Sequence, residues 1–245
     1  MAKRLLDILV SLIGLVVFSP VMLGLAVLVK LDSPGPALYR APRIGRGGRL
    51  FHMLKFRTMV TDAHQVGPAI TYDSDSRITR LGAILRSVRL DELPQLINVL
   101  RGEMSLVGPR PEAPHLVAYY TPEQRAVLQV RPGVTGLAQL AFRNEAAMLS
   151  GDSVEQDYVE IILPRKLSID LAYVEHQSLW LDIRILVSTV LAVVGDRLAA
   201  ANQGLDAGSR SHFKPLVHVG GNLSPVERWA RAPVEDLCQA VLGLE

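Results

Sequence analysis

An uncharged apolar run near the N-terminus constrains this chain more than any other feature. Residues 8–29 contain no charged side chain. As a continuous helix the run would be about 33 Å long, enough to cross about 30 Å of hydrocarbon. It is too long for the core of a signal peptide, and no small-x-small cleavage site precedes a polar segment. Apolar residues make up 49% of the 245 residues, which also indicates contact with a membrane.

Two topologies are compatible with this run. Its length favours a single spanning helix, but Pro20 follows Ser19 at its middle, where a proline removes a backbone donor and kinks a helix. Basic residues also flank the run on both sides: Lys3 and Arg4 before it, and Lys30, Arg40, Arg43, Arg46 and Arg49 after it. The positive-inside rule then places both ends in the cytoplasm, which a re-entrant helix bent at Ser19-Pro20 would satisfy. Physics alone leaves the spanning and re-entrant topologies open.

Charge and cysteine content exclude several classes of protein. The net charge of +2 is too small to indicate binding of nucleic acid. Cys238 is the only cysteine, so no internal disulfide can form, and this is typical of a reducing compartment.

The segment after the apolar run predicts a small β-hairpin. "ALYRAPRIGRGGRLFHMLKFRTM" contains a strand, a turn at residues 45–48 and a second strand over residues 51–56. Residues 40–57 hold basic side chains and no acid. This basic hairpin could hold anionic lipid headgroups, at about 1 kcal/mol per charge. Alternatively, Lys55 and Arg57 could turn inward and bind a phosphorylated substrate.

The rest of the chain predicts a mainly helical α+β protein. Apolar spacing indicates helices over residues 78–88 and from Asp91 onward, and further helix from Tyr158 onward. "MSLVG" predicts a short strand, and "RPGVTG" (131–136) a rigid loop. The apolar residues 183–194 are too few to span a membrane, so they predict either a core helix or a helix lying at the membrane interface.

Four regions follow from this organisation. We expect residues 1–31 to form the membrane helix, 32–195 the main domain, which holds the candidate catalytic residues described below, and 196–222 a linker rich in Gly, Ala, Asn and His. Residues 223–245 form a C-terminal helical extension, which Ser224 would cap.

An acidic pair in "RLDELPQLINVLRGEMSLVGPRP" (89–111) carries the chemistry. Asp91 and Glu92 at a helix start could be purely structural, because the helix dipole favours acids there by about 0.3–1 kcal/mol each. Adjacent carboxylates can also share one Mg²⁺, which prefers carboxylates and phosphate oxygens. Arg86 lies upstream, and Arg110 stands between two prolines, where arginine is suited to bidentate phosphate contacts. An aspartate beside these cations could act as the nucleophile in phosphoryl transfer.

These blocks, in their order and spacing, resemble the bacterial monotopic phosphoglycosyl transferases, also called the polyprenyl-phosphate glycosylphosphotransferase family. The resemblance covers residues 3–195. It depends on "FSP" in the apolar run, "KFRTM", "LDELPQLINVLRGEMSLVGPRP", "RPGVTGLAQ", "IDLAYV" and "LDIRIL".

The resemblance implies a location and a reaction. Family members sit on the cytoplasmic face of the bacterial plasma membrane, held by a re-entrant helix that is broken at Ser-Pro, here Ser19 and Pro20. They move a sugar 1-phosphate from a UDP-sugar to undecaprenyl phosphate in surface polysaccharide assembly. The aspartate, here Asp91, forms a covalent phosphosugar intermediate and UMP leaves, while Glu92 assists with Mg²⁺ or proton handling.

The resemblance also implies roles for other residues. The residues that would lie near substrate phosphate are Arg110, Arg86, Arg57 and Lys55. Those that would shape the nucleotide pocket are Arg131, Pro132, Gly133 and Gly136, unless "RPGVTG" is a plain turn. Asp170 and Asp182 match family positions and would be supporting carboxylates.

Several alternatives stay open at the level of sequence. The chain could instead be a membrane-anchored scaffold whose acidic pair only caps a helix, or a lipid-phosphate phosphatase. Arg89 departs from the family pattern and adds a cation beside the acidic pair. Residues 196–245 have no counterpart in that pattern and could form a homodimer contact, a partner site or a membrane-lying helix. No residue indicates which sugar is transferred or which glycan is built.

Overall fold

The computed structural model describes residues 1–203 apart from 64–66, 68–69, 73–74, 144, 146–148 and 150–153. Side chains of residues 196–203 are outside the description. The predicted C-terminal extension, at residues 223–245, lies outside the described residues, as does most of the predicted linker.

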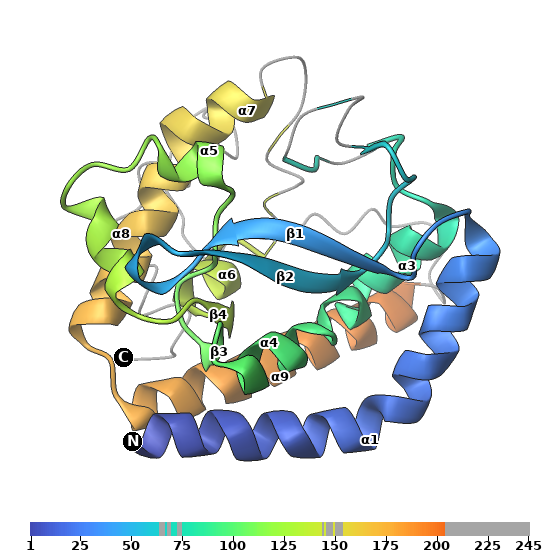
Figure 1. The fold of residues 1–245 in the computed structure, drawn as a ribbon, viewed down its shortest axis with the longest axis horizontal. Coiled ribbons are helices and arrows are strands. Elements are labelled where there is room, and N and C mark those ends of the chain that lie inside the picture. The colour runs from blue at the N-terminus through green and yellow to red at the C-terminus, as the bar shows by residue number, and fades with distance from the viewer. Residues whose placement is uncertain are drawn as a thin grey trace.

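A single long helix, α1 (Ala2–Asp32), contains the apolar run, and Figure 1 shows that it bends part-way along its length. Pro20 lies inside the helix and accounts for the bend, because it cannot donate to the Val16 carbonyl four residues earlier. The Ser19 hydroxyl donates to that carbonyl instead, at 2.8 Å. By length and composition α1 could cross a membrane, and most of its apolar side chains are exposed.

Polar side chains fix the first turns of α1 to the rest of the molecule. Asp7 is 2% exposed and accepts hydrogen bonds from Ser105 and from the Leu106 backbone, both at 3.0 Å. Lys3 forms an ion pair with Asp182 at 2.7 Å. Because these partners are buried, this half of α1 is joined to the domain rather than only adjacent to it.

The predicted β-hairpin is confirmed. Strands β1 (Leu38–Ile44) and β2 (Leu50–Phe56) pair antiparallel, with Tyr39 opposite Lys55. The turn between them needs glycine, because Gly47 and Gly48 have φ values of 69° and 74°.

A second pair of strands, parallel to each other, joins two segments for which the sequence analysis predicted no contact. Strand β3 (Ser105–Val107) was predicted, but β4 (Gly133–Thr135) lies where a plain rigid loop was expected, so that prediction was incomplete. Gly108 and Gly133 permit this pairing. A Cβ on Gly133 would lie 2.1 Å from the Gly108 nitrogen.

Helices make up most of the remainder, as predicted. They are α3 (Arg80–Ser87), α4 (Gln95–Arg101), α5 (Pro114–Val117), α6 (Leu137–Ala141), α7 (Val154–Asp157), α8 (Leu163–Glu175) and α9 (Leu179–Gln203). The main core packs buried residues of α4 to α8 against β2 and β3, and includes Met53, Val99, Met104, Leu167 and Tyr173. In Figure 1, α4 runs close to the first half of α1, and the two helices are in contact.

Helix α9 differs from its prediction in two ways. It continues to Gln203, so the first eight residues of the predicted linker are helical. Ile185 is fully buried whereas Val190 and Leu191 are more than 60% exposed. The helix therefore contributes one face to the core, as one of the two alternatives predicted, and leaves an apolar face uncovered by the described residues. A position at the membrane interface stays a prediction.

Candidate active site

The acidic pair lies in a short 3₁₀ turn, η2 (Leu90–Glu92), between α3 and α4. The sequence predicted a continuous helix from Asp91, but α4 begins only at Gln95, after Pro94. Arg89 starts the turn with φ 57°, a left-handed conformation that a residue with a side chain adopts at a cost. The turn lies beside strand β2, where Glu92 meets Lys55.

The Glu92 carboxylate forms ion pairs with two basic side chains from segments that are distant in sequence. Lys55 of β2 and Arg110 both donate to its Oε1 at 2.8 Å. Burial acts to raise the pKa of Glu92, but Lys55 and Arg110 outweigh it and hold that pKa well below its usual range. Glu92 in turn raises the pKa of Arg110, while burial lowers the pKa of Lys55. The turn therefore presents an ionised glutamate between two cations.

Asp91 is the less engaged member of the pair. It is 6% exposed, and within the described part of the chain its carboxylate accepts no hydrogen bond. Burial raises its pKa, opposed by the charges of Lys55, Arg86 and Arg89. A buried carboxylate that is surrounded by cations and has no hydrogen-bond donor keeps its lone pairs available for a phosphorus centre or a metal ion.

Arg110 lies on a loop whose backbone is tightly confined. Pro109 accepts from the Gly133 nitrogen and Gly108 donates to Thr135, both at 2.9 Å. A Cβ on Gly136 would lie 2.3 Å from the Gly108 carbonyl oxygen. The backbone at the predicted pocket residues Gly133 and Gly136 therefore lies directly against the backbone of the arginine loop. This close approach requires glycine at both positions.

Asp170 of α8 lies behind the same loop. It is 3% exposed, and burial raises its pKa to about 7 against the opposing charge of Lys166 and the backbone N–H groups of Arg110 and Ala138. Its Oδ1 has no hydrogen-bond partner among the described residues. The supporting position predicted for this carboxylate is thus next to the backbone of the arginine loop rather than next to Asp91.

A buried polar cluster on the far side of Arg110 was missed by the sequence analysis. Glu112 accepts from the Tyr158 hydroxyl at 2.7 Å and pairs with Lys166 at 3.3 Å, and Lys166 also pairs with Glu145 at 2.9 Å. The pKa of Lys166 is well above its usual value, because these acids outweigh the effect of burial. The acid directly after "GPRP" was the one available signal.

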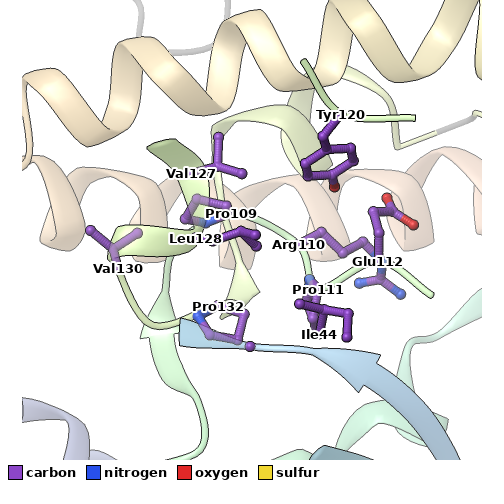
Figure 2. Close-up of a pocket in the computed structure, with 11 residues that line it drawn as sticks. Ile44, Pro109, Arg110, Pro111, Glu112, Tyr120, Val127, Leu128, Val130 and Pro132 are labelled. Atoms are coloured by element: carbon purple, nitrogen blue, oxygen red, sulfur yellow. The ribbon is translucent and has the colours of Figure 1, made fainter. Parts of the chain in front are cut away.

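Figure 2 shows a small hollow beside this cluster. Arg110, Glu112 and Tyr120 lie at one side of it, and Val127, Leu128, Val130 and Pro132 at the other. Burial raises the pKa of the Tyr120 phenol well above its usual value. Pro132, predicted in the nucleotide pocket, therefore lines a largely apolar hollow that Arg110 also lines.

The remaining predicted residues are placed unequally. Arg86 lies close enough to Asp91 to influence its pKa and donates to the Thr58 hydroxyl at 2.8 Å. Arg131 donates to the Gly102 carbonyl at 2.9 Å, and Asp182 accepts from Tyr173 at 2.6 Å as well as from Lys3. Arg57 bonds the C-terminal end of α1. The structure thus brings Lys55, Arg86 and Arg110 to the acidic turn, and gives Arg131, Asp182 and Arg57 other partners.

Comparison with known proteins shows the family of this chain. The protein-family model described as bacterial sugar transferase matches residues 1–196 of this chain. The chain is 40% identical over 195 residues to a UDP-N-acetylgalactosamine-undecaprenyl-phosphate N-acetylgalactosaminephosphotransferase of Aeromonas hydrophila. It is 42% identical over 193 residues to a UDP-glucose:undecaprenyl-phosphate glucose-1-phosphate transferase of Caulobacter vibrioides, and 42% identical over 197 residues to an exopolysaccharide production protein of Rhizobium leguminosarum.

The matched segments differ in how much of each relative they cover. They include 77–78% of this chain, but 43% of the Aeromonas protein, 68% of the Caulobacter protein and 94% of the Rhizobium protein. The matched region contains α1, the β-hairpin, the acidic turn and the arginine loop. This chain belongs to the bacterial sugar transferase family.

Proposed function

We propose that this chain transfers a sugar 1-phosphate from a UDP-sugar to undecaprenyl phosphate and releases UMP, as the first membrane step of a surface polysaccharide pathway. The relatives whose names specify both a UDP-sugar and undecaprenyl phosphate support this substrate class. The observation that carries the proposal is the contrast within the acidic turn. Glu92 is occupied by Lys55 and Arg110, whereas the buried Asp91 carboxylate accepts no hydrogen bond from the described residues.

The proposed reaction has two balanced displacements at one phosphorus atom. An Asp91 oxygen attacks the phosphorus that bears the sugar, and the bond from that phosphorus to the bridging oxygen breaks, so UMP leaves with the electron pair. A phosphate oxygen of undecaprenyl phosphate then attacks the same phosphorus. The bond to Asp91 breaks and its carboxylate is regenerated.

Arg110 and Lys55 supply positive charge where the transferring group gains negative charge. Both already lie within 2.8 Å of Glu92 Oε1, so little reorganisation is needed when a diphosphate enters between them. Arg86 adds a third cation near Asp91. We expect the donor diphosphate to share these cations with Glu92 rather than to displace it.

Mg²⁺ is the proposed cofactor, and the carboxylates of the turn suit it. Both ion pairs of Glu92 use Oε1, and no hydrogen bond from the described residues reaches Oε2. No group of three His, Cys, Asp or Glu residues that could hold a metal occurs among the described residues. Asp91 and Glu92 Oε2 would therefore hold Mg²⁺ together with phosphate oxygens of the donor, and the ion would neutralise charge on the diphosphate.

We further propose that α1 is re-entrant and that the chain is monotopic on the cytoplasmic face of the inner membrane. The bend at Pro20, the Ser19 hydrogen bond and the basic residues on both sides of the helix support this topology. It would hold the acidic turn near the headgroups, where the phosphate of undecaprenyl phosphate lies. Tags at both ends of the chain should be inaccessible from outside intact cells, and an exposed N-terminus would contradict the topology.

The direct test of the reaction is Asp91→Asn, assayed with a panel of UDP-sugars, Mg²⁺ and undecaprenyl phosphate. Asparagine has nearly the same shape, and the Asp91 side chain caps neither η2 nor α4 in the structure, so a scaffold would be unaffected. We expect UMP release and formation of the lipid-linked sugar to be lost in this variant. Unchanged turnover would exclude Asp91 as the nucleophile, and a lipid product that loses phosphate would indicate a phosphatase.

A further inference from the structure

The second half of α1, after Pro20, packs directly against the acidic turn. Leu25 and Val29 of α1 form a small core, separate from the main one, with Phe56 at the end of β2 and Leu85 of α3. Leu90, the residue before Asp91, packs against this core. The end of the apolar helix thus shares one small hydrophobic cluster with the residue that precedes the proposed nucleophile.

Arg57 fastens the end of α1 to this cluster. Its side chain donates to three backbone carbonyls, those of Val29 at 3.2 Å, Ser33 at 2.7 Å and Pro34. Arg57 is 7% exposed. Val29 is in the last turn of α1, where carbonyls lack partners within the helix, and Ser33 and Pro34 follow the helix directly. A buried arginine that bonds these three carbonyls therefore fixes where the helix ends.

The backbone around Arg57 continues this connection to the site. Lys55, two residues earlier and within β2, pairs with Glu92. Thr58, the next residue, accepts from Arg86 through its hydroxyl and from the Thr79 nitrogen through its carbonyl. Residues 55–58 therefore connect the acidic turn, the start of α3 and the end of α1, so a movement of one of them is passed to the others.

We propose that Arg57 is a positioning residue for the acceptor step. It sets the distance and orientation of the second half of α1, and with it the polyprenyl phosphate that approaches along this helix, relative to Asp91. This inference rests on the proposed function, but it assigns Arg57 to the lipid half of the reaction instead of to contact with the donor's phosphates. The donor enters at Lys55, Glu92 and Arg110, whose mutual ion pairs do not involve Arg57.

Arg4 provides a matched control within the same helix. It too is an arginine of limited exposure that bonds the carbonyls at a helix end, those of Val99 at 2.6 Å and Leu100 at 3.0 Å in α4. It lies before Pro20, however, and fastens the first half of α1 to the end of α4 that is remote from the acidic turn. Arg4→Gln therefore removes a similar set of hydrogen bonds without affecting the small core around Leu90.

The experiment compares Arg57→Gln, Arg57→Lys and Arg4→Gln in lipid nanodiscs. The donor half-reaction is measured as the UMP burst without acceptor, and the lipid step as the KM for undecaprenyl phosphate in steady state. We expect Arg57→Gln to keep the wild-type burst amplitude and rate within twofold and to raise the KM for the lipid at least fivefold. Arg57→Lys, with one ammonium in place of a fork of donors, should show a smaller rise. Arg4→Gln should behave like wild type.

Several outcomes would overturn the proposal. An equal loss of burst rate and lipid step in Arg57→Gln would indicate donor binding or general damage, and a similar rise in KM in Arg4→Gln would show that any loosening of α1 suffices. If Arg57→Gln does not retain a cooperative thermal transition, the same criteria apply to Arg57→Lys. An absent burst in the wild-type protein would instead contradict the covalent mechanism, so the two failures are distinguishable.

Discussion

The double ion pair of Glu92 gives a sharp prediction about stability. Glu92→Gln keeps the shape of the side chain and removes the charge that Lys55 and Arg110 share. At 2.8 Å and an effective dielectric constant of about 20, each pair has a gross attraction of about 6 kcal/mol. Most of this attraction offsets the cost of removing the ions from water. Breaking a buried pair by deleting one partner costs about 3–5 kcal/mol.

The exposure of these side chains sets the expected value within that range. The side chains of Glu92, Lys55 and Arg110 retain 12%, 19% and 22% exposure, so water screens them in part. We therefore expect Glu92→Gln to lower the free energy of unfolding by about 3 kcal/mol, which for a domain of this size lowers Tm by about 6–12 °C.

A double-mutant cycle separates the ion pair from other effects of the substitution. Thermal unfolding is followed by circular dichroism in detergent for wild type, Glu92→Gln, Lys55→Met and the double variant. Glu123→Gln serves as an exposed control and should leave Tm unchanged. We expect the double variant to be more stable than the sum of the single losses predicts, by about 1.5–3 kcal/mol for a charged hydrogen bond. A coupling below about 0.5 kcal/mol would refute the view that burial strengthens this pair.

Two further predictions test the support of the arginine loop. The pKa of Asp170 is about 7 in the folded protein against an ordinary 3.8, so between these pH values folding takes up a proton. The free energy of unfolding should therefore fall as pH rises from 4 to 7, by at most about 4 kcal/mol, and then level off. Asp170→Asn should flatten this part of a Tm-against-pH curve, and an unchanged slope would contradict the raised pKa of Asp170. Gly133→Ala places a Cβ 2.1 Å from the Gly108 nitrogen and should cost about 1–3 kcal/mol and reduce UMP release at least tenfold, whereas Gly195→Ala, with nothing within 4 Å, should leave UMP release unchanged. Equal turnover in these two glycine variants would show that the loop does not need this close approach.

Local patterns in the sequence predicted the local structure well. The apolar alternation and glycines of residues 38–56 specify the hairpin, and the apolar spacing after Ile78 specifies α3, because both patterns reflect contacts between residues close in sequence. The acidic pair and Arg110 could also be singled out, since their chemistry is unusual in an apolar chain. Their distances from one another could not.

The incorrect or incomplete predictions concern contacts between distant segments. The parallel pairing of β3 with β4 depends on the close approach of Gly108 and Gly133, which no local pattern reveals. Arg57 resembles a phosphate ligand in sequence, because it stands in a basic segment two residues after Lys55. Only the fold shows that the end of α1 lies next to Arg57. Backbone carbonyls at and just after this helix end accept the three hydrogen bonds that the Arg57 side chain donates.

The covalent intermediate on Asp91 is the central claim, and mass spectrometry of the digested protein tests it most directly. Protein is mixed with a UDP-sugar and Mg²⁺ without lipid acceptor, quenched and digested. The account predicts a mass increase of one sugar phosphate on the peptide that contains Asp91, which disappears on addition of undecaprenyl phosphate and never forms in Asp91→Asn. UMP release without any such adduct, or an adduct that persists in Asp91→Asn, would contradict it.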